Sequence, residues 1–535
     1  MTQIQLYDTT LRDGMQGHGM SLSVDEKVRV AHALDDLGIH LIEAGFPSSN
    51  PKEVELFELL AREHFETAVI AGFGMTRRRG VEARDDEGLK VLANSFSPVC
   101  TLVGKTWSLH LEKVTKVSVE ENLAMIAESV AFLREEGKRV VYDAEHFFDA
   151  YRDDPEYTHA CLRAAVDAGA ETVTLCDTNG SSLPSEIAAA TASVVEMLAG
   201  SNVQVGIHSH DDAGCGVANA LAAVEAGATH VQGTINGYGE RTGNANLVTI
   251  LPNLQLKMGY ECVPAEKLAT LTETAHYIDE LCNVTPNPDQ PYVGTNAFSH
   301  KGGMHVAGML EDARTFEHID PDTVGNSRNM LISELSGKGT VQARAADAGL
   351  KIDADTAARV VDRVKELEHL GYHFEAANAS FDLLIRRETG DYEPLFELES
   401  WRTIVEKHKD GAVRTEATIK IIVDGERYVR TAEGNGPVNA LDRALRDAIG
   451  ERYPHLKDIN LVNFKVRILD ERKGTGAVTR VLLDASDGHA SWGAIGVSEN
   501  IIEASWEALV DALEYGMQPG RDGQSSKHPA SKTQE

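Results

Sequence analysis

The stretch from Thr172 to Leu198, TVTLCDTNGSSLPSEIAAATASVVEML, decides the fold. It opens with the β-type run Thr172–Leu175 and passes through a loop that contains Gly and Ser. It continues as the apolar-periodic segment Pro184–Leu198, which starts with Pro as helices often do. The stretch therefore predicts one strand–loop–helix unit.

The same alternation runs through residues 1–258. The other expected strands are Ile4–Tyr7, Leu41–Ala44, Ala68–Gly72, Val99–Val103, Val140–Asp143, Val203–Ile207 and His230–Thr234. About eight strand–helix units in roughly 250 residues are typical of a TIM (β/α)8 barrel. A doubly wound open sheet is the alternative, because alternation alone does not show closure. The number of units favours the barrel.

The strand–helix alternation does not continue after residue 258. Residues 259–390 are expected to form helical linker subdomains, and residues 396–516 a C-terminal regulatory domain that also dimerises. In that domain a strands-then-helix pattern occurs twice, with helices expected at Pro437–Ile449 and Glu499–Tyr515. This repetition predicts an α+β domain with internal pseudosymmetry. The tail, residues 517–535, is rich in Ser, Gly, Lys and Gln and is expected to be disordered.

Composition limits the partners. The 535 residues carry 51 Lys+Arg and 83 Asp+Glu, a formal net charge of −32, which argues against a nucleic-acid partner. No apolar run reaches the ~18 residues of a membrane helix, and the first residues do not resemble a signal peptide. The six cysteines occur singly, without a CxxC pair. We expect a reduced, cytoplasmic protein without a membrane partner.

A first polar cluster, Asp8-Thr9-Thr10-Leu11-Arg12-Asp13-Gly14-Met15-Gln16, directly follows the first strand. Arg12 offers a bidentate guanidinium for a carboxylate, and Asp13 offers an oxygen for a metal ion. Taken alone, the cluster could equally be an ordinary salt bridge in a loop.

A second cluster, His208-Ser209-His210, ends the seventh strand. Residues i and i+2 of an extended segment point to the same side, so both imidazoles can reach one ion. Asn244 follows the eighth strand and can add an oxygen. Because barrel enzymes place their catalytic groups at the carboxyl ends of the strands, these residues share a rim with Asp13. The mixed N/O set suits Mn²⁺, Zn²⁺, Mg²⁺ or Co²⁺, and a metal site is favoured over a structural polar pair.

Other polar residues are expected on the same rim. Glu43, Glu145 and Thr178 follow or end the second, fifth and sixth strands, where they become candidates for proton transfer or for orienting ligands and substrate. The run Arg77-Arg78-Arg79 follows the third strand. It could meet an anionic substrate tail or be a solvated charge run.

These residues resemble a known family, the 2-isopropylmalate, homocitrate and citramalate synthases. The matching stretches are Leu11-Arg12-Asp13-Gly14-x-Gln16 followed by Lys27, Val205–Asn219 around the histidine pair, Gly239–Ala245, and Gly434–Leu441 in the last domain. The stretches Leu6–Gln16 and Tyr142–Asp149 are most similar to the citramalate synthase branch. The resemblance covers nearly the whole chain.

The resemblance implies a Claisen condensation of acetyl-CoA with a 2-oxo acid, followed by thioester hydrolysis. It implies that a divalent metal ion polarises the oxo group and is held by Asp13, His208, His210 and Asn244. By the same resemblance, Arg12 and Thr178 bind the carboxylate of the oxo acid.

The resemblance also suggests the proton-transfer groups. Glu145 is the carboxylate expected to help remove a methyl proton from the acetyl group, and His305 is a histidine that the linker brings over the barrel mouth. Whether Glu145, His305 or an activated water takes the proton stays open. Glu43 is expected to support the groups that bind metal and substrate.

Pyruvate is the expected oxo acid, which implies citramalate synthesis for isoleucine. Tyr142 is expected to fill the pocket and leave room only for a methyl group. A homodimer that responds to isoleucine is also expected. The alternatives are synthesis of 2-isopropylmalate or homocitrate, a lyase of the 3-hydroxy-3-methylglutaryl-CoA type, and a non-catalytic sensor. The C-terminal domain argues against the lyase, and the polar rim argues against the sensor.

Overall fold

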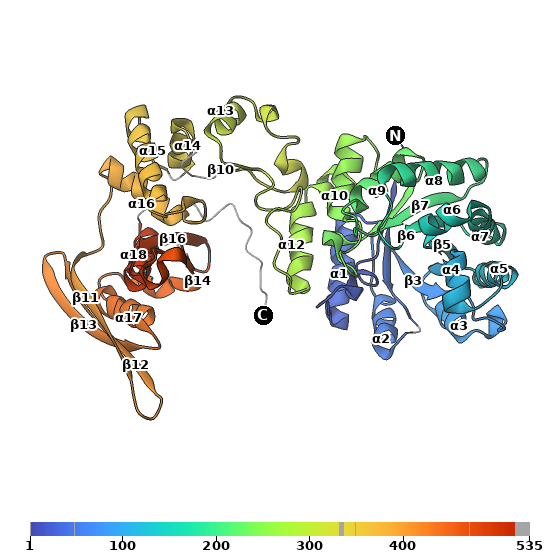
Figure 1. Ribbon diagram of the computed structural model, residues 1–535, viewed down its shortest axis with the longest axis horizontal. Helices are drawn as coiled ribbons and strands as arrows, with labels where there is room; N and C mark the ends of the chain where they lie inside the picture. Colours follow the sequence, from blue (N-terminus) through green and yellow to red (C-terminus); the bar gives the residue numbers. More distant parts are fainter. Residues whose placement is uncertain (1, 48, 331–335, 348, 470, 519–535) are drawn as a thin grey trace. The chain divides into compact units, whose positions relative to one another are not determined.

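The computed structural model describes residues 2–47, 49–330, 336–347, 349–469 and 471–518 (Figure 1). It divides into two compact units: Met1–Phe298 with His318–Arg328, and Ser299–Glu317 with Asn329–Glu535. Within the described residues, no helix has both the length and the apolar character needed to cross a membrane. The tail that was expected to be disordered lies, from residue 519 on, outside the described residues.

The first unit is a closed barrel of eight parallel strands, so the predicted TIM barrel is confirmed and the open-sheet alternative is wrong. Its strands are β1 (Gln5–Asp8), β2 (Leu41–Gly45), β3 (Val69–Met75), β4 (Val99–Lys105), β5 (Arg139–Glu145), β6 (Thr172–Asp177), β7 (Gln204–Ser209) and β8 (His230–Gly233). Strand β1 pairs with both β2 and β8, which closes the barrel.

Helices surround these strands in the blue-to-green part of Figure 1. They are α1 (Val24–Leu37), α2 (Pro51–Leu60), α3 (Glu87–Asn94), α4 (Ser108–His110), α5 (Val119–Glu135), α6 (Phe147–Asp153), α7 (Pro155–Asp167), α8 (Pro184–Met197), α9 (Gly216–Glu225), α10 (Leu247–Pro252), α11 (Ala265–Leu268) and α12 (Leu271–Leu281). Local sequence sets their ends: a reciprocal capping box between Ser23 and Glu26 starts α1, and Gly38 in the left-handed region ends it.

Side chains alternate between the inside of the barrel and the helices around it. The Tyr7 hydroxyl of β1 lies 2.6 Å from the Thr101 hydroxyl of β4, and since these strands are not neighbours the contact crosses the interior. The next side chain along β4, Leu102, packs in the core cluster between strands and helices. On β5, which pairs in register with β4, Val141, Asp143 and Glu145 therefore face inward.

The described part of the second unit contains helices, a two-stranded parallel sheet (β9 and β10) and two three-stranded sheets. Its elements are β9 (Ser299–His300), α13 (Gly303–Glu311), β10 (Asn329–Met330), α14 (Lys338–Asp347), α15 (Ala354–His369), α16 (Asn378–Thr389), β11 (Glu397–Lys407), β12 (Val413–Val423), β13 (Glu426–Gly434), α17 (Pro437–Ile449), β14 (Asn460–Ile468), β15 (Thr479–Ser486), β16 (Ser491–Ser498) and α18 (Ile501–Gly516). Two three-stranded antiparallel sheets, β11-β12-β13 and β14-β15-β16, are each followed by a helix. The predicted duplicated α+β unit is confirmed.

Strand β11 was not predicted from the sequence. It gives the first sheet three strands, as many as the second sheet has, so the two halves match more closely than the sequence patterns indicated. Most residues of β11 are exposed, with Trp401 and Thr403 half-buried. Without one buried face, the strand lacks the period-2 apolar pattern that identifies strands in a sequence.

Candidate functional site

A tight turn after β1 places Arg12 and Asp13 at the carboxyl end of the barrel. The Thr9 carbonyl accepts hydrogen bonds from the backbone N–H groups of Arg12 and Asp13, at 3.2 and 2.8 Å. The Asp8 carboxylate accepts from the Thr10 N–H and hydroxyl, at 2.9 and 2.8 Å. Short polar side chains that bond to nearby backbone favour such turns, so the Asp-Thr-Thr sequence itself bends the chain.

Asn244 reaches the same place through backbone pairing beyond the end of β7. Asn244 and His210 form an isolated antiparallel bridge, and the Ala245 N–H donates to the Ser209 carbonyl at 2.8 Å. Gly239 makes room for the amide: a Cβ atom there would lie 2.0 Å from Asn244 Oδ1, and the φ of Gly239 is +158°. A glycine is therefore required beside Asn244.

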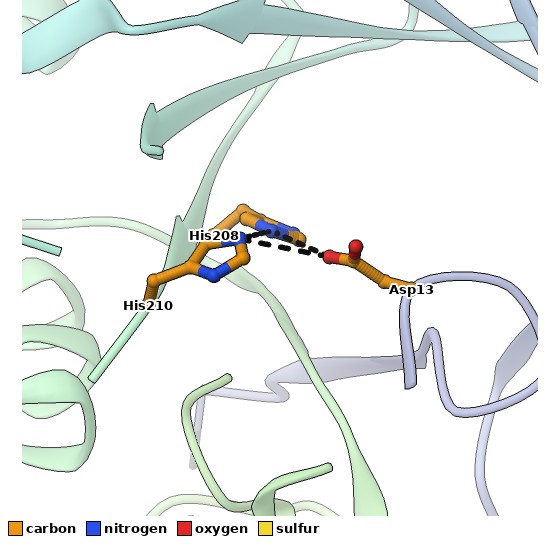
Figure 2. A group of neighbouring side chains, drawn as sticks. All are labelled: Asp13, His208 and His210. Carbon is orange, nitrogen blue, oxygen red and sulfur yellow. Dashed lines mark hydrogen bonds and ion pairs between the residues drawn. The ribbon is translucent and has the colours of Figure 1, made fainter. Parts of the chain in front are cut away.

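The four residues predicted as metal ligands converge, as Figure 2 shows for Asp13, His208 and His210. The potential ligand atoms of those three residues all lie within 4.8 Å of one another. Asp13 Oδ2 lies 3.2 Å from His208 Nε2 and 3.7 Å from His210 Nε2, and the two Nε2 atoms are 3.4 Å apart. Asn244 Nδ2 donates to Asp13 Oδ2 at 2.7 Å. All four side chains are buried.

This geometry fits a divalent metal ion. Neighbouring ligand atoms about 2.1 Å from one octahedral ion lie about 3.0 Å apart, close to the separations seen here. Asn244 Oδ1 is buried and finds no hydrogen-bond partner among the described residues, and a half-turn of the amide would point it at the same place. Burial and the nearby His208 lower the pKa of His210 to about 4, so this imidazole is neutral at pH 7, as a metal ligand must be.

The buried charges also fit a cation. Asp13, Glu43 and Asp143 are buried carboxylates, and Arg12 is the guanidinium beside them. With neutral histidines the ionised groups carry a formal charge of −2, which a divalent ion would neutralise. Burial opposes a charge on His208, but the adjacent Asp13 raises the pKa of His208 above its usual value, so this ring attracts a proton where no ion is bound. Burial alone would raise the pKa of the Asp13 carboxyl, but Arg12 and the two histidines hold that pKa well below its usual range. Asp13 is therefore an anionic oxygen donor.

Arg12 is fixed by its neighbours. Its Nε donates to Glu43 Oε1 at 2.5 Å, its Nη1 lies 3.1 Å from Asp13 Oδ1, and its guanidinium carbon lies 4.1 Å from the centre of the Phe73 ring. Glu43 is held in turn by the Tyr7 hydroxyl, which donates to its Oε2 at 2.8 Å. Glu43 thus orients Arg12, and the guanidinium has little freedom to move.

Glu145 is the last residue of β5, and Thr178 directly follows the neighbouring strand β6. Lys105 of β4 forms an ion pair with Glu145, and His110 Nδ1 lies 4.0 Å from the same carboxylate. The His146 N–H donates to Thr178 Oγ1 at 2.9 Å, which leaves the hydroxyl hydrogen of Thr178 to donate elsewhere. Arg241 donates to the Thr178 carbonyl at 2.9 Å and fixes the start of this loop.

The prediction that Tyr142 lines the substrate pocket is wrong. Tyr142 is fully buried in the core between strands and helices. A Cβ atom on Gly104 would lie 2.6 Å from its hydroxyl, and Tyr157 and Cys161 of α7 are among its neighbours. Because successive strand residues face opposite sides, Asp143 and not Tyr142 points into the barrel.

His305 lies in the second unit, in α13. Its ring stacks on Phe316 with 4.3 Å between the ring centres. It belongs to a different unit from the barrel residues, and its catalytic role stays a prediction.

Two site residues were not predicted. Gln232 of β8 accepts a hydrogen bond from His208 Nδ1 at 2.9 Å and donates to Asp143 Oδ1 at 3.0 Å. The two residues are Gln232 and Asp143. Gln232 lies two residues after the interior polar residue His230, and Asp143 lies two residues before the interior Glu145. Polar residues at period 2 in a barrel strand were the signal that could have identified them.

A cavity of about 870 Å³ opens beside this site. Its lining includes Phe46, whose ring packs edge-on against Phe73, and Lys105, the partner of Glu145. All three residues of the predicted arginine run, Arg77, Arg78 and Arg79, also line it. Of these, Arg77 is buried and paired with Glu121 and Glu128, so its charge is already neutralised by protein carboxylates.

Three family matches cover most of the chain. The HMGL-like family matches residues 3–278, and the homocitrate synthase post-HMGL domain-like family matches residues 292–371. The LeuA allosteric (dimerisation) domain matches residues 375–517. The chain therefore belongs to the class of proteins in which an HMGL-like barrel is followed by a LeuA-type allosteric (dimerisation) domain.

Curated relatives narrow this class. The (R)-citramalate synthase of Streptomyces coelicolor is 48% identical over 96% of this chain and 96% of its own length. That of Aquifex aeolicus is 46% identical over 96% of this chain and 97% of its own. A Methanopyrus kandleri protein named "probable 2-isopropylmalate synthase" is 32% identical, over 97% and 99%. The chain therefore belongs to the HMGL-like family, in the branch of the (R)-citramalate synthases, and the predicted resemblance is confirmed.

Proposed function

We propose that this chain condenses acetyl-CoA with pyruvate and hydrolyses the resulting thioester to give citramalate and CoA. The convergence of Asp13, His208 and His210 beside the fixed Arg12 is the observation that carries the chemistry. Relatives named (R)-citramalate synthase, at 43–48% identity, support pyruvate as the oxo acid. Citramalate supplies isoleucine synthesis, which is the pathway we propose.

The oxo acid is proposed to be bound at two points, its oxo group by the metal ion and its carboxylate by Arg12. A divalent ion held by Asp13, His208, His210 and Asn244 would polarise the oxo group and make its carbon electrophilic. Arg12 uses Nε and Nη1 on Glu43 and Asp13, so its Nη2 group is the part proposed to bind the carboxylate of pyruvate. The Thr178 hydroxyl is proposed to donate to the same carboxylate.

Glu145 is the residue we propose to take a proton from the acetyl methyl group. Lys105 forms an ion pair with its carboxylate at the mouth of the barrel, and His110 lies beside it. The carbanion then attacks the oxo carbon of pyruvate as the C=O π bond breaks, and the oxygen takes up a proton to become the hydroxyl of the product. Water then cleaves the thioester to give the carboxylate of citramalate and free CoA. His305 of the linker is proposed as a second proton-transfer group, and an activated water remains the alternative base.

Acetyl-CoA is proposed to lie in the cavity beside Glu145. Its volume, about 870 Å³, is within the usual range for ligand pockets. Apolar residues such as Met75, Val103 and Val117 suit the pantetheine arm, and Arg78 and Arg79 suit its phosphates.

We propose that Phe73, in place of Tyr142, selects pyruvate. Its ring packs under the Arg12 guanidinium, so it is the large apolar side chain next to the proposed carboxylate-binding group. We propose that it leaves room for a methyl group. An isopropyl group would then be disfavoured about 10- to 200-fold in kcat/KM.

The second unit is proposed to form a homodimer and to bind isoleucine as an effector. Edge strand β14 carries Phe464, Val466 and Ile468, which are 44%, 43% and 53% exposed. Apolar side chains on an unpaired edge invite a partner, and the match to the LeuA allosteric (dimerisation) domain supports a second copy of this chain.

Free thiol release from acetyl-CoA, measured with pyruvate, 2-oxoisovalerate and 2-oxoglutarate in turn, tests the proposal. We expect pyruvate to have the highest kcat/KM and the product to have the mass of citramalate. A preference for 2-oxoisovalerate would make the chain a 2-isopropylmalate synthase and leave the metal site standing. Absence of thiol release with all three acids would contradict the condensation itself.

A further inference from the structure

Two buried hydrogen bonds lie directly behind the candidate metal ligand His208. His208 Nδ1 lies 2.9 Å from Gln232 Oε1, and Gln232 Nε2 donates to Asp143 Oδ1 at 3.0 Å. On the other side of the ring, His208 Nε2 faces Asp13 Oδ2 at 3.2 Å. Each of these residues is at most 5% exposed, so water does not compete for the contacts.

The orientation of the Gln232 amide is determined by its surroundings. Its Nε2 lies 3.0 Å from Asp143 Oδ1, 3.2 Å from Thr174 Oγ1 and 3.4 Å from His230 Nε2. His230 Nδ1 lies 2.9 Å from Gln5 Oε1, which can only accept, so His230 Nε2 is itself an acceptor. Asp143 Oδ1 and His230 Nε2 accept, and the Thr174 hydroxyl can accept as well, so the NH₂ group belongs at this position and Oε1 faces His208.

This orientation dictates the tautomer of His208. Gln232 Oε1 only accepts, so the ring hydrogen of a neutral His208 must sit on Nδ1. The lone pair is then on Nε2, the atom that faces Asp13 and His210. A hydrogen bond from the far nitrogen of a metal-binding histidine commonly fixes both its tautomer and its ring orientation.

We propose that Gln232 is a positioning residue that presents His208 Nε2 as a metal ligand, with Asp143 holding the amide in place. The inference rests on the proposed role of His208. A purely space-filling Gln232 would be the alternative, and the two roles predict opposite results for two variants of nearly the same size.

Gln232→Leu keeps the volume but removes the acceptor for His208 Nδ1–H. The double variant Gln232→Glu/Asp143→Asn keeps the acceptor, because Glu can accept from His208 while Asn donates to it from the other side. A space-filling role predicts that Leu is tolerated at least as well as the buried double change. The positioning role predicts that only the double variant retains metal binding.

The measurement is the Kd for Mn²⁺ of the metal-free full-length protein, obtained by equilibrium dialysis. We expect Gln232→Leu to weaken binding about 10- to 100-fold and Gln232→Glu/Asp143→Asn to stay within a few-fold of wild type. Gln290→Leu is the matched control: it removes another buried amide, which bonds to Asn236 and lies outside this chain of contacts, and its Mn²⁺ affinity should be unchanged.

Wild-type Mn²⁺ affinity in Gln232→Leu, or equal losses in Gln232→Leu and the double variant, would overturn the inference. His208→Ala separates this failure from failure of the proposed function. If His208→Ala loses Mn²⁺ but Gln232→Leu does not, only the positioning role is wrong. If His208→Ala also retains Mn²⁺, the metal site itself is wrong.

Discussion

Gly233→Ala should lower the activity strongly without changing any residue proposed to bind metal or substrate. A Cβ atom on Gly233 would lie 2.4 Å from the Ala245 carbonyl oxygen and 3.1 Å from Leu247. Contacts become ordinary from 3.4 Å, so the backbone at Ala245 must move by about 1.0 Å. Asn244 is the preceding residue and bonds to Asp13 at 2.7 Å, so the displacement disturbs the candidate metal site.

A misplacement of about 1 Å in an active site can cost about 100-fold in rate, which is the fall in kcat/KM that we expect. Overpacking should also cost about 1–3 kcal/mol of stability. The assay is thiol release with pyruvate, together with bound metal per chain and a thermal melt. Gly339→Ala is the control, because a Cβ atom there meets open space. If Gly233→Ala kept wild-type kcat/KM and metal content, the proposed position of Asn244 in the site would be refuted.

Three further changes address separate parts of the proposed mechanism. Glu145→Gln should lower kcat about 10²- to 10⁴-fold with bound metal unchanged, and equal activity of this variant would exclude Glu145 as the base. Arg79→Ala should raise the KM for acetyl-CoA up to about fivefold with little change in kcat, since an exposed charge contributes up to about 1 kcal/mol; an unchanged KM would argue against phosphates at this end of the cavity. Removing the chain after Phe396 should abolish inhibition by isoleucine, because coupling requires a site that binds the effector; inhibition that persists in the truncated protein would place the effector elsewhere.

The sequence was enough to predict that groups from distant parts of the chain converge, because the barrel topology alone determines which strand ends lie together. In a parallel barrel the carboxyl ends of all strands meet at one rim, so Asp13 after β1 and His208 at the end of β7 must lie near each other. The i, i+2 spacing then selects His210 as the second imidazole on the same side.

Strand register was the limit of the sequence reasoning. The same i, i+2 rule, counted back from the inward-facing Glu145, selects Asp143 and excludes Tyr142. A one-residue error exchanges the core face for the site face, and apolar patterns alone do not exclude it in a strand that is buried on both sides.

Other features had no readable local signal. Gln232 matters through contacts with Asp143, Thr174 and His230, which come from three different strands. Such a set follows from the cross-section of the closed barrel and not from any one segment. Likewise, the sequence of α13 alone does not determine where the side chain of His305 lies.

The most direct measurement is a Mn²⁺ titration of the metal-free wild-type protein and of His208→Ala, with bound metal and thiol release from acetyl-CoA and pyruvate followed together. Removing His208 takes one of the converging ligands and leaves the strand pairing of β7 intact. We predict that turnover of the wild type rises in proportion to bound metal, and that His208→Ala neither binds Mn²⁺ at the same concentrations nor turns over. Full turnover by the metal-free wild type, or by His208→Ala without bound metal, would contradict a metal-dependent condensation at this site.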